Sequence, residues 1–472
     1  MHTIEQIFIN GEFVTPHGTE WFDLYNPATA RVIGQVRLAD EVDAERAIAA
    51  AKAAFPAWSQ TTKQERIAAL KRMHAAVAAR HDDLLEAVIE EYGAPASRSA
   101  WMASYPAEVI AQAIEALEAF AFVTPAGGAA TVQMTPLGVA GLITPWNSDA
   151  GFICGKLAAA LAAGCTAVIK PSEMSALQTQ IVTEALRNAA LPPGVFNIVT
   201  GRGETVGETI SRHPDVAKIS FTGSTNTGKA ILRNAAESFK RVTLELGGKS
   251  PTILLDDVDL TQAIPLAIQA GFMNSGQACV AGTRILVPQA RKGEIETALA
   301  EAVAAVKSGD PRDSATEIGP MVSEKQWLRV QGYICKGIEE GARLLAGGEG
   351  RPDGTRDGWF VRPTLFADVN NQMTVARDEI FGPVLCVIPY QDEAEAVSIA
   401  NDTEYGLSAL VLGGDADRAR RVAQQIVSGR VLVNTLAHEP KAPFGGFKHS
   451  GVGREMGEWG IRAFMEPRSI LG

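Results

Sequence analysis

The strongest constraint on the fold is a change of hydrophobic period at about residue 138. From Asp43 to about Ala121 the chain is rich in alanine, leucine and paired charges at helical spacing, which predicts helices. Beyond this point, short β-branched runs alternate with segments of helical composition. The runs cover residues 138–144, 167–170, 195–199, 218–221 and 242–246, and the helical segments cover residues 150–163, 175–190, 204–212 and 227–238. This alternation predicts parallel strands joined by crossover helices, and therefore a doubly wound α/β sheet.

A second series of the same kind follows Pro251. A chain of 472 residues exceeds the usual size of one hydrophobic core, so we expect two α/β domains. Short apolar runs at residues 7–9 and 32–36 predict a strand-rich entry to the first domain. The second series predicts strands at residues 252–255, 284–287, 384–388, 407–412 and 430–433, and helices near residues 260–272 and 292–306.

Composition and charge argue against several classes of protein. The net charge of -11 argues against a nucleic-acid-binding surface. The most apolar stretch, residues 151–169, contains Lys156 and many alanines, so we interpret it as soluble core and expect no membrane partner. The start of the chain lacks a basic region followed by an apolar core, which argues against a secretory signal. Five scattered cysteines without metal-ligand spacing predict no metal site and a reducing compartment, the cytoplasm.

One cysteine stands in a setting suited to catalysis. Cys279 lies among small and polar residues, 34 positions after Glu245. The flanking Gly276 and Gly282 allow a substrate and the backbone to come close. A thiol nucleophile needs such an open approach, groups that favour the thiolate, and a base for later water chemistry. Because a lone cysteine is more often a small buried residue, the assignment depends on the other motifs.

A glycine turn within residues 218–230 indicates a nucleotide site of some kind. A strand, a tight turn at Gly223 and a helix start follow one another here, which suits a pyrophosphate. Gly223 and Gly228 nearly complete a P-loop, but Ala230 replaces the hydroxyl residue that would hold Mg²⁺. The Gly-x-Gly-x-x-Gly fingerprint is also missing from the expected turns. The pattern therefore disfavours a phosphate-hydrolysing NTPase, and the turn alone does not identify a ligand.

A second nucleotide contact is possible at the end of the strand predicted at residues 167–170. Lys170 and Glu173 are three positions apart, and their side chains can hydrogen-bond sugar hydroxyls. The same two residues can also form a plain surface ion pair. Their spacing leaves both interpretations open.

Seven short motifs occur in one order at compatible spacings. They are Thr144-Pro145-Trp146-Asn147, Lys170-Pro171-Ser172-Glu173, Phe221-Thr222-Gly223-Ser224, Glu245-Leu246-Gly247-Gly248-Lys249, Gly276-Gln277-Ala278-Cys279, Glu379-Ile380-Phe381-Gly382-Pro383-Val384 and Pro443-Phe444-Gly445-Gly446-Phe447-Lys448. With these motifs, the chain resembles the NAD(P)-dependent aldehyde dehydrogenase superfamily across nearly its whole length.

The resemblance implies the organisation of the fold and the partners. It implies two doubly wound, Rossmann-like α/β domains with a small β element for oligomerisation. The expected NAD-binding domain covers residues 1–117 and 137–246, the catalytic domain residues 247–448, and the oligomerisation element residues 118–136 and 449–472. The implied partners are NAD as cofactor, a small-molecule aldehyde as substrate, and copies of the chain in a homodimer or homotetramer.

The resemblance also implies the catalytic roles. Cys279 would attack the aldehyde carbon, and the Asn147 amide with the Cys279 backbone N–H would hold the developing oxyanion. Hydride transfer to the nicotinamide would leave a thioester. Glu245 would then activate the water that releases the acid. Lys156 and Glu455 match positions linked to the polar network of the active site.

The cofactor contacts are implied in the same way. Lys170 and Glu173 match the adenosine-ribose contacts, and Glu379 lies on the nicotinamide-ribose side. We expect NAD over NADP, because the Glu173 carboxylate accepts hydrogen bonds from ribose hydroxyls but repels a 2′-phosphate. The other expected cofactor contacts are Thr144, Pro145, Trp146, Ser172, Gly203, Phe221, Thr222, Gly223, Ser224, Leu246, Gly247 and Phe381.

The expected substrate tunnel departs from the commonest family pattern just after Asn147. Ser148, Phe152 and Gly155 stand at i, i+4 and i+7 of the predicted helix, on the face that lines the tunnel in the family. Two of these side chains are small, which predicts a wide tunnel for bulky aromatic or long-chain aldehydes, with Met273 as a flexible second wall. The alternative is that Ser148 and Gly155 only permit close helix packing. The chain also ends soon after Leu471, so the C-terminal strand is expected to be short and a tetramer is less secure than a dimer.

Two other functions are compatible with the same fold. In a CoA-acylating semialdehyde dehydrogenase a thiol, not water, resolves the thioester, whereas Glu245 favours water. A non-catalytic nucleotide-binding or structural protein could also keep the fold. The presence of Asn147, Glu245 and Cys279 together argues against this last alternative.

Overall fold

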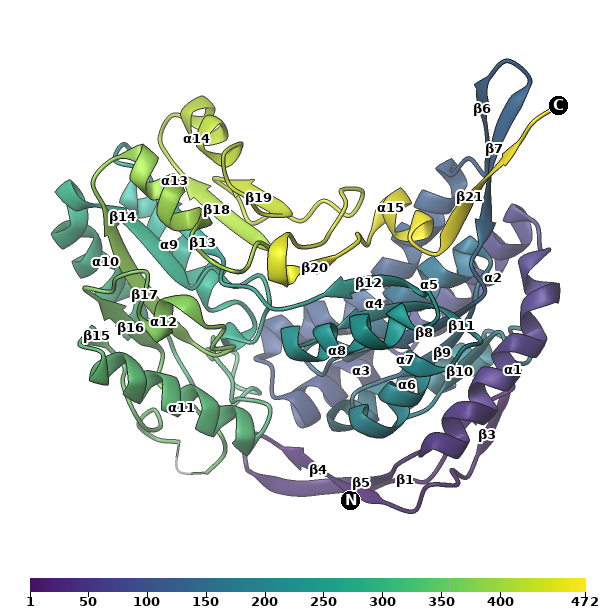
Figure 1. The fold of residues 1–472 in the computed structure, drawn as a ribbon. Helices are drawn as coiled ribbons and strands as arrows, with labels where there is room; N and C mark the ends of the chain where they lie inside the picture. Colours follow the sequence, from purple (N-terminus) through teal and green to yellow (C-terminus); the bar gives the residue numbers. More distant parts are fainter. Residues whose placement is uncertain (356) are drawn as a thin grey trace.

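The computed structural model describes residues 1–355 and 357–472, which form two lobes (Figure 1). The larger lobe contains a sheet with the order β20-β12-β11-β8-β9-β10-β2-β3, whose five strands from β12 to β10 are parallel. Its strands are β2 (Ile7–Ile9), β3 (Glu12–Val14), β8 (Val139–Ile143), β9 (Thr166–Lys170), β10 (Phe196–Ile198), β11 (Val216–Thr222), β12 (Arg241–Glu245) and β20 (Gly451–Val452).

Helices cover both faces of this sheet. Ala167 and Ile169 of β9 pack into the core under α2, α4, α5 and α6, whereas Val168 between them packs into the core under α1, α7 and α8. Both faces are therefore apolar, as a buried parallel sheet requires. The helices of the lobe are α1 (Glu41–Ser59), α2 (Lys63–Ala78), α3 (His81–Ala87), η1 (Val88–Tyr92), α4 (Ala96–Ala119), α5 (Asp149–Ala163), η2 (Glu173–Ser175), α6 (Ala176–Asn188), η3 (Gly203–Gly207), α7 (Glu208–Arg212), α8 (Thr225–Ala236) and α15 (Gly457–Arg462).

The second lobe is built on a sheet with the order β15-β16-β17-β14-β13-β18-β19, parallel except for the pairing of β15 with β16. The adjacent residues Ile253 and Leu254 of this sheet pack on opposite faces. Ile253 packs into the core under α13 and α14, and Leu254 packs into the core under α9 and α10. The two sheets confirm the predicted doubly wound α/β fold. The elements are β13 (Pro251–Leu254), α9 (Leu260–Gly271), η4 (Met273–Gly276), β14 (Arg284–Pro288), η5 (Gln289–Arg291), α10 (Lys292–Ala305), α11 (Glu324–Glu339), β15 (Arg343–Ala346), β16 (Thr364–Ala367), α12 (Thr374–Arg377), β17 (Val384–Tyr390), α13 (Glu393–Asn401), β18 (Ser408–Leu412), α14 (Ala416–Ala423), β19 (Arg430–Val433) and η6 (Lys448–Ser450).

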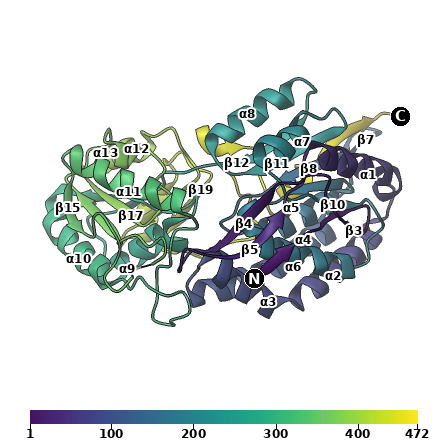
Figure 2. The same cartoon turned by 90° about the horizontal axis from the view of Figure 1, so that it is seen from below.

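Two small sheets complete the molecule. The N-terminal sheet has the order β1-β5-β4, and these strands are β1 (His2–Ile4), β4 (Trp21–Asn26) and β5 (Arg31–Arg37). Figure 2 shows β4 and β5 reaching toward the second lobe, where the Trp359 N–H donates to the Pro27 carbonyl over 3.0 Å. The other sheet has the order β21-β7-β6, from β6 (Val123–Gly127), β7 (Ala130–Pro136) and β21 (Met465–Ile470).

The hairpin β6–β7 projects away from the body of the molecule (Figure 1). The six residues of β21 pair with β7 along their whole length, from Met465 opposite Pro136 to Ile470 opposite Thr131. Other parts of the expected oligomerisation element lie elsewhere: β20 pairs with β12 in the large sheet, and α15 packs against α4. The projecting sheet is thus formed by residues 123–136 and 465–470.

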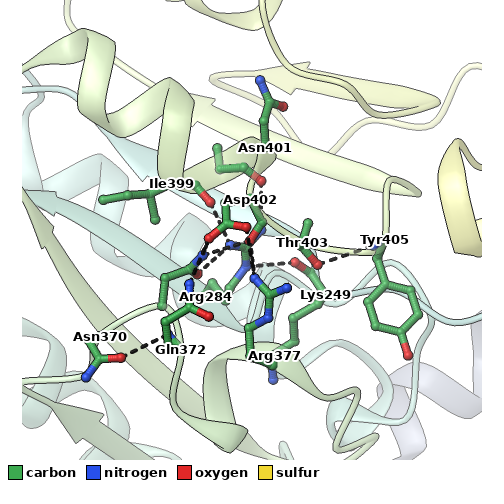
Figure 3. A network of polar contacts seen from close by, with 12 residues as sticks. Lys249, Arg284, Asn370, Gln372, Arg377, Ile399, Asn401, Asp402, Thr403 and Tyr405 are labelled. Carbon is green, nitrogen blue, oxygen red and sulfur yellow. Dashed lines mark hydrogen bonds and ion pairs between the residues drawn. The ribbon is translucent and has the colours of Figure 1, made fainter.

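A buried arginine links the crossing between the two large sheets to the second lobe. Arg284 is 0% exposed, and its guanidinium donates only to oxygens of other segments (Figure 3). The acceptors are the carbonyls of Lys249 at 3.0 Å, Ile399 at 2.9 Å and Ala400 at 2.9 Å, and the Asn371 side chain at 2.9 Å. Asp402 continues the network by accepting from Asn371, Gln372 and Arg377. One side chain therefore holds the segment that follows β12 against the last turn of α13.

We expect Arg284→Met to lower the free energy of unfolding by about 3 kcal/mol or more, because it leaves several buried carbonyls without a donor. Denaturant and thermal unfolding of the purified variant measure this change. Arg233→Met is the matched control, since Arg233 is exposed on α8. A loss no larger than that of the control would contradict the assignment.

Candidate active site

A cleft of about 740 Å³ lies between the lobes and is lined from both. The large sheet contributes Asn147 after β8 and Glu245 at the end of β12. The second lobe contributes Cys279 after η4 and Glu379 before β17. Carboxyl ends of parallel strands meet at such an edge, where ligands of α/β sheets bind. The structure thus brings three of the five residues with an expected catalytic role, Cys279, Asn147 and Glu245, into one cleft.

The loop before Cys279 has a constrained backbone. Asn274, Ser275 and Gly276 are successively left-handed, with φ values of 55°, 59° and 74°. This conformation is unfavourable for residues with a Cβ, and it occurs where surrounding contacts hold it, often at functional sites. The Ser275 hydroxyl accepts from the Gly319 N–H at 3.0 Å, which fixes the turn against the loop before α11.

Asn147 is held against this loop from both sides. Its side-chain amide donates to the Gln277 carbonyl at 3.0 Å, and its own carbonyl accepts from the Asn274 amide at 3.1 Å. Gln277 is 1% exposed and bonds Tyr92, Pro320 and Val322 through its side chain. An amide nitrogen carries two protons, so one N–H of Asn147 fixes its position and the other is left for a ligand.

Asn274 and Tyr92 support the site although the sequence motifs do not indicate such a role. Asn274 has a partial local signal, because an Asn-Ser-Gly run favours a left-handed turn. Tyr92 lies in η1 and reaches Gln277 over 185 positions of sequence, a contact that no local pattern indicates.

Glu245 is buried without a hydrogen-bond partner on either carboxyl oxygen among the described residues. Burial raises the pKa of the Glu245 carboxyl well above its ordinary value, and Glu455 raises it further, whereas Lys156 and Arg454 lower it. A buried unpaired carboxyl is most stable as the neutral acid. The surroundings of Glu245 therefore favour uptake of a proton by its carboxylate.

Lys156 and Glu455 form one polar network beside Glu245. The Lys156 ammonium lies 2.5 Å from a Glu455 carboxylate oxygen and donates to the Ser220 hydroxyl at 3.0 Å. That hydroxyl donates to Glu455 at 2.9 Å. Lys156 comes from α5 and Glu455 precedes α15, so the network joins a core helix to the C-terminal segment.

The cofactor side of the cleft contains most of the expected contacts. Lys170 and Glu173 form an ion pair of 3.1 Å, with side chains 6% and 18% exposed, so the pair is mostly buried and not a plain surface pair. The Glu379 carboxylate accepts from the Gly248 N–H at 3.0 Å, and burial raises its pKa to about 7. Among the expected residues that line the cleft are Pro145, Trp146, Glu173, Thr222, Gly223, Ser224, Leu246, Gly247 and Phe381.

Other expected cofactor residues do not line the cleft. Thr144 donates from its hydroxyl to Asp149 at 2.7 Å, and Ser172 accepts from the Met174 N–H at 3.3 Å. Phe221 is a core residue whose ring lies beneath Gly223. Gly203 is the first residue of η3, and Lys170 forms its ion pair with Glu173, which lines the cleft.

The expected substrate residues are not gathered in one place. Phe152 and Gly155 line a largely apolar cavity together with Tyr105 and Phe444, next to Lys156 and Glu455. Met273 lines a different hollow, beside Arg98 and Phe272. Ser148 precedes α5 and lies next to Gly151. These positions separate Met273 from the face formed by Phe152 and Gly155.

Comparison with known proteins decides the family. The model of the aldehyde dehydrogenase family matches residues 13–470. The chain belongs to the aldehyde dehydrogenase family. The resemblance predicted from the seven motifs is confirmed, and the two large sheets are those of an aldehyde dehydrogenase.

Its relatives cover the whole chain. A putative aldehyde dehydrogenase of Staphylococcus haemolyticus is 44% identical over 100% of this chain and 99% of its own length. A 3-succinoylsemialdehyde-pyridine dehydrogenase of Pseudomonas sp is 43% identical over the same shares.

Solved aldehyde dehydrogenases share the fold. A mutant aldehyde dehydrogenase of Pseudomonas syringae in complex with NAD+ and octanal matches with a TM-score of 0.97 and 43% identity, covering 99% of this chain and 97% of that one. A Mycobacterium tuberculosis aldehyde dehydrogenase complexed with NAD+ matches with a TM-score of 0.96 and 41% identity, covering 99% and 98%. Within residues 1–355 and 357–472 of this aldehyde dehydrogenase, no helix is long and apolar enough to cross a membrane, and no cluster of His, Cys, Asp and Glu could hold a metal ion.

The Cys279 thiol is expected to react slowly with iodoacetamide in the enzyme without nucleotide. Its pKa is raised to about 12, first by burial and then by the Glu379 and Glu245 carboxyls, while Arg430 opposes them. Because only the thiolate reacts, the alkylation rate should rise about tenfold per pH unit between pH 7 and 10. Mass spectrometry of the Cys279 peptide measures this rate, with the peptide of the partly exposed Cys335 as comparator. A plateau for Cys279 below pH 9 would show that its pKa is not raised.

Proposed function

We propose that this chain oxidises an aldehyde to a carboxylic acid with NAD as the hydride acceptor. The observation that carries the proposal is the convergence of Cys279, Asn147 and Glu245 in one cleft between the two sheets. Family membership supports the reaction, and the NAD+ complexes of the two solved relatives support the cofactor.

The residues present fit such a dinucleotide. Gly223 and Ser224 line the cleft at the start of α8, whose backbone N–H groups suit a pyrophosphate. The Glu173 and Glu379 carboxylates lie in the same cleft, and each can accept hydrogen bonds from a ribose. When bound, NAD supplies a nicotinamide ring that accepts the hydride.

The side chains of the cleft account for the remaining steps. The Cys279 thiol loses its proton to solvent and its sulfur forms a bond to the aldehyde carbon, while the carbonyl π electrons move to oxygen. Asn147 and the Cys279 N–H stabilise that oxygen, and the C–H electron pair leaves as hydride, which regenerates the carbonyl as a thioester. Glu245 then takes a proton from water as the water attacks the thioester. The C–S bond breaks to give the acid and the Cys279 thiolate, which takes that proton from Glu245 and becomes the thiol again.

A carboxyl with a raised pKa is a stronger base once it is ionised. The rate of the hydrolysis step should therefore fall as the pH falls through the raised pKa of Glu245. The position of Glu245 in the same cleft as Cys279 favours water over CoA as the group that resolves the thioester.

We expect Glu245→Gln to keep acylation and to lose hydrolysis. Rapid mixing of this variant with NAD and aldehyde should give a burst of NADH about equal to the enzyme concentration, followed by turnover reduced by about a hundredfold or more. Cys279→Ala is the control, and it should bind NAD while giving neither burst nor turnover. A uniform loss of rate without a burst would remove Glu245 from the hydrolysis step.

We further infer that the substrate is a bulky aromatic or long-chain aldehyde. Gly155 borders the apolar cavity lined by Phe152, Tyr105 and Phe444. A Cβ at Gly155 would meet Val109 at 3.6 and 3.7 Å, which is ordinary contact, so close helix packing does not require glycine here. The complex of the Pseudomonas syringae enzyme with octanal supports a long substrate.

Gly155→Trp should raise KM by about tenfold for octanal and benzaldehyde and by less than about threefold for acetaldehyde, because the indole fills the cavity. Gly155→Ala is the control and should leave all three values nearly unchanged. Steady-state NADH formation measures them. Equal effects of tryptophan on large and small aldehydes would show that Gly155 does not face the substrate.

We also infer a cytoplasmic homodimer or homotetramer joined through the projecting sheet. Val123, Ile470 and Leu471 on or next to its strands are 58%, 48% and 80% exposed. Exposed apolar side chains on an open sheet edge favour pairing with a second chain.

A further inference from the structure

We propose that Arg202 gives this enzyme NADP as a second cofactor by offering its guanidinium to the 2′-phosphate of the adenosine ribose. The proposal rests on the proposed function, which places Glu173 at that ribose. The enzyme still prefers NAD, but its preference over NADP is less than about tenfold. A glutamate without a nearby cation would give a preference of about ten- to hundredfold.

Arg202 lies within the cleft at the point where the ribose is expected. It immediately precedes η3, and both Arg202 and Glu173 line the cleft. Its Nη1 atom is 3.6 Å from a Glu173 carboxylate oxygen. A group that contacts a hydroxyl-binding carboxylate is within reach of a substituent on the same ribose.

The position of the guanidinium is held from the far side. Its Nε and Nη2 atoms donate to one Glu20 oxygen at 3.0 and 2.7 Å. The guanidinium carbon lies 4.9 Å from the centre of the Phe22 ring, a cation–π contact. Glu20 and Phe22 therefore orient the plane of the guanidinium, and its side chain remains 32% exposed.

The Arg202 guanidinium still has N–H donors available at Nη1, on the side of Glu173. Nη1 makes no hydrogen bond among the described residues; it has only the longer ion-pair approach to Glu173. A guanidinium has five N–H donors and binds phosphate oxygens in pairs, which a lysine ammonium does not do.

The charges around Glu173 weaken its repulsion of a phosphate. Its carboxylate lies 3.1 Å from the Lys170 ammonium as well as 3.6 Å from Arg202. Both cations hold the pKa of the Glu173 carboxyl below its ordinary value against the effect of burial. The carboxylate thus stays ionised for ribose hydroxyls. Lys170 and Arg202 offset its negative charge toward a 2′-phosphate, although Glu20 neutralises part of the Arg202 charge.

Two adenine nucleotides without nicotinamide test the proposal by calorimetry. The first is 5′-AMP, and the second is 2′,5′-ADP, which adds only the 2′-phosphate. We expect the unchanged enzyme to bind the two within about tenfold of each other. Arg202→Gln should weaken the binding of 2′,5′-ADP by about tenfold or more and the binding of 5′-AMP by less than about threefold. The affinity of Arg202→Lys for 2′,5′-ADP should lie between those of the unchanged enzyme and Arg202→Gln, since lysine keeps the charge and loses the paired donors.

Glu20→Gln separates this role from general structure. It removes the competing acceptor and should strengthen 2′,5′-ADP binding while leaving 5′-AMP unchanged. Arg212→Gln is the matched control, because Arg212 pairs with Glu208 on the surface with a side chain 66% exposed. The ratio of kcat/KM for NAD to that for NADP should rise in Arg202→Gln and fall in Glu20→Gln.

The outcomes distinguish the two proposals. If 5′-AMP binds and NADH forms, but Arg202→Gln changes both nucleotides equally or neither, Arg202 is not a specificity residue and only this inference fails. This inference alone also fails if the unchanged enzyme binds 5′-AMP but not 2′,5′-ADP. If no adenine nucleotide binds and no aldehyde yields NADH, the proposed function fails with it.

Discussion

The site depends on the close approach of the backbone where the chain crosses between the two large sheets. A Cβ atom at Gly248 would lie 2.3 Å from the Cys279 carbonyl oxygen, and one at Gly247 would lie 2.5 Å from a Glu379 carboxylate oxygen. These separations are far below van der Waals contact. A side chain at Gly248 would displace the backbone at Cys279, and one at Gly247 would displace the Glu379 carboxylate. The Gly248 N–H uses the close approach to donate to Glu379. Two residues without side chains thus let Glu245, Cys279 and Glu379 share one cleft.

The same crossing explains the unusual electrostatics of the site. Glu245 ends β12 directly before the glycines, and Gly445 of the second lobe comes so close that its Cβ would lie 2.7 Å from the carboxyl. The carboxyl is therefore enclosed without a partner, which destabilises its charged form. Lys156 and Glu455 lie close enough to shift its pKa in opposite directions. A local conflict of this kind is expected where a fold serves chemistry as well as stability.

Local pattern was sufficient for the fold class and insufficient for the contacts that orient the site. The strand predicted at residues 167–170 is β9 (Thr166–Lys170), because a buried parallel strand between helices leaves a strong periodic signal. Arg202, by contrast, meets Glu20 across 182 positions of sequence, and such a contact follows only from the packed tertiary structure. The place of Met273 also follows only from the tertiary structure. A left-handed turn begins at Asn274, directly after Met273, and Met273 lines a hollow apart from the cavity lined by Phe152.

The two glycines on α5 show why residue type alone does not reveal the reason for its use. At Gly151 a Cβ would lie 2.6 Å from the Tyr105 ring, so the packing of α4 against α5 requires glycine there. At Gly155, one turn further, a Cβ would make only ordinary contact with Val109, and the space beside it belongs to the apolar cavity. An unfilled apolar space forfeits dispersion contacts that a larger side chain would supply. Packing therefore accounts for the first glycine but not for the second, whose missing side chain leaves the cavity open.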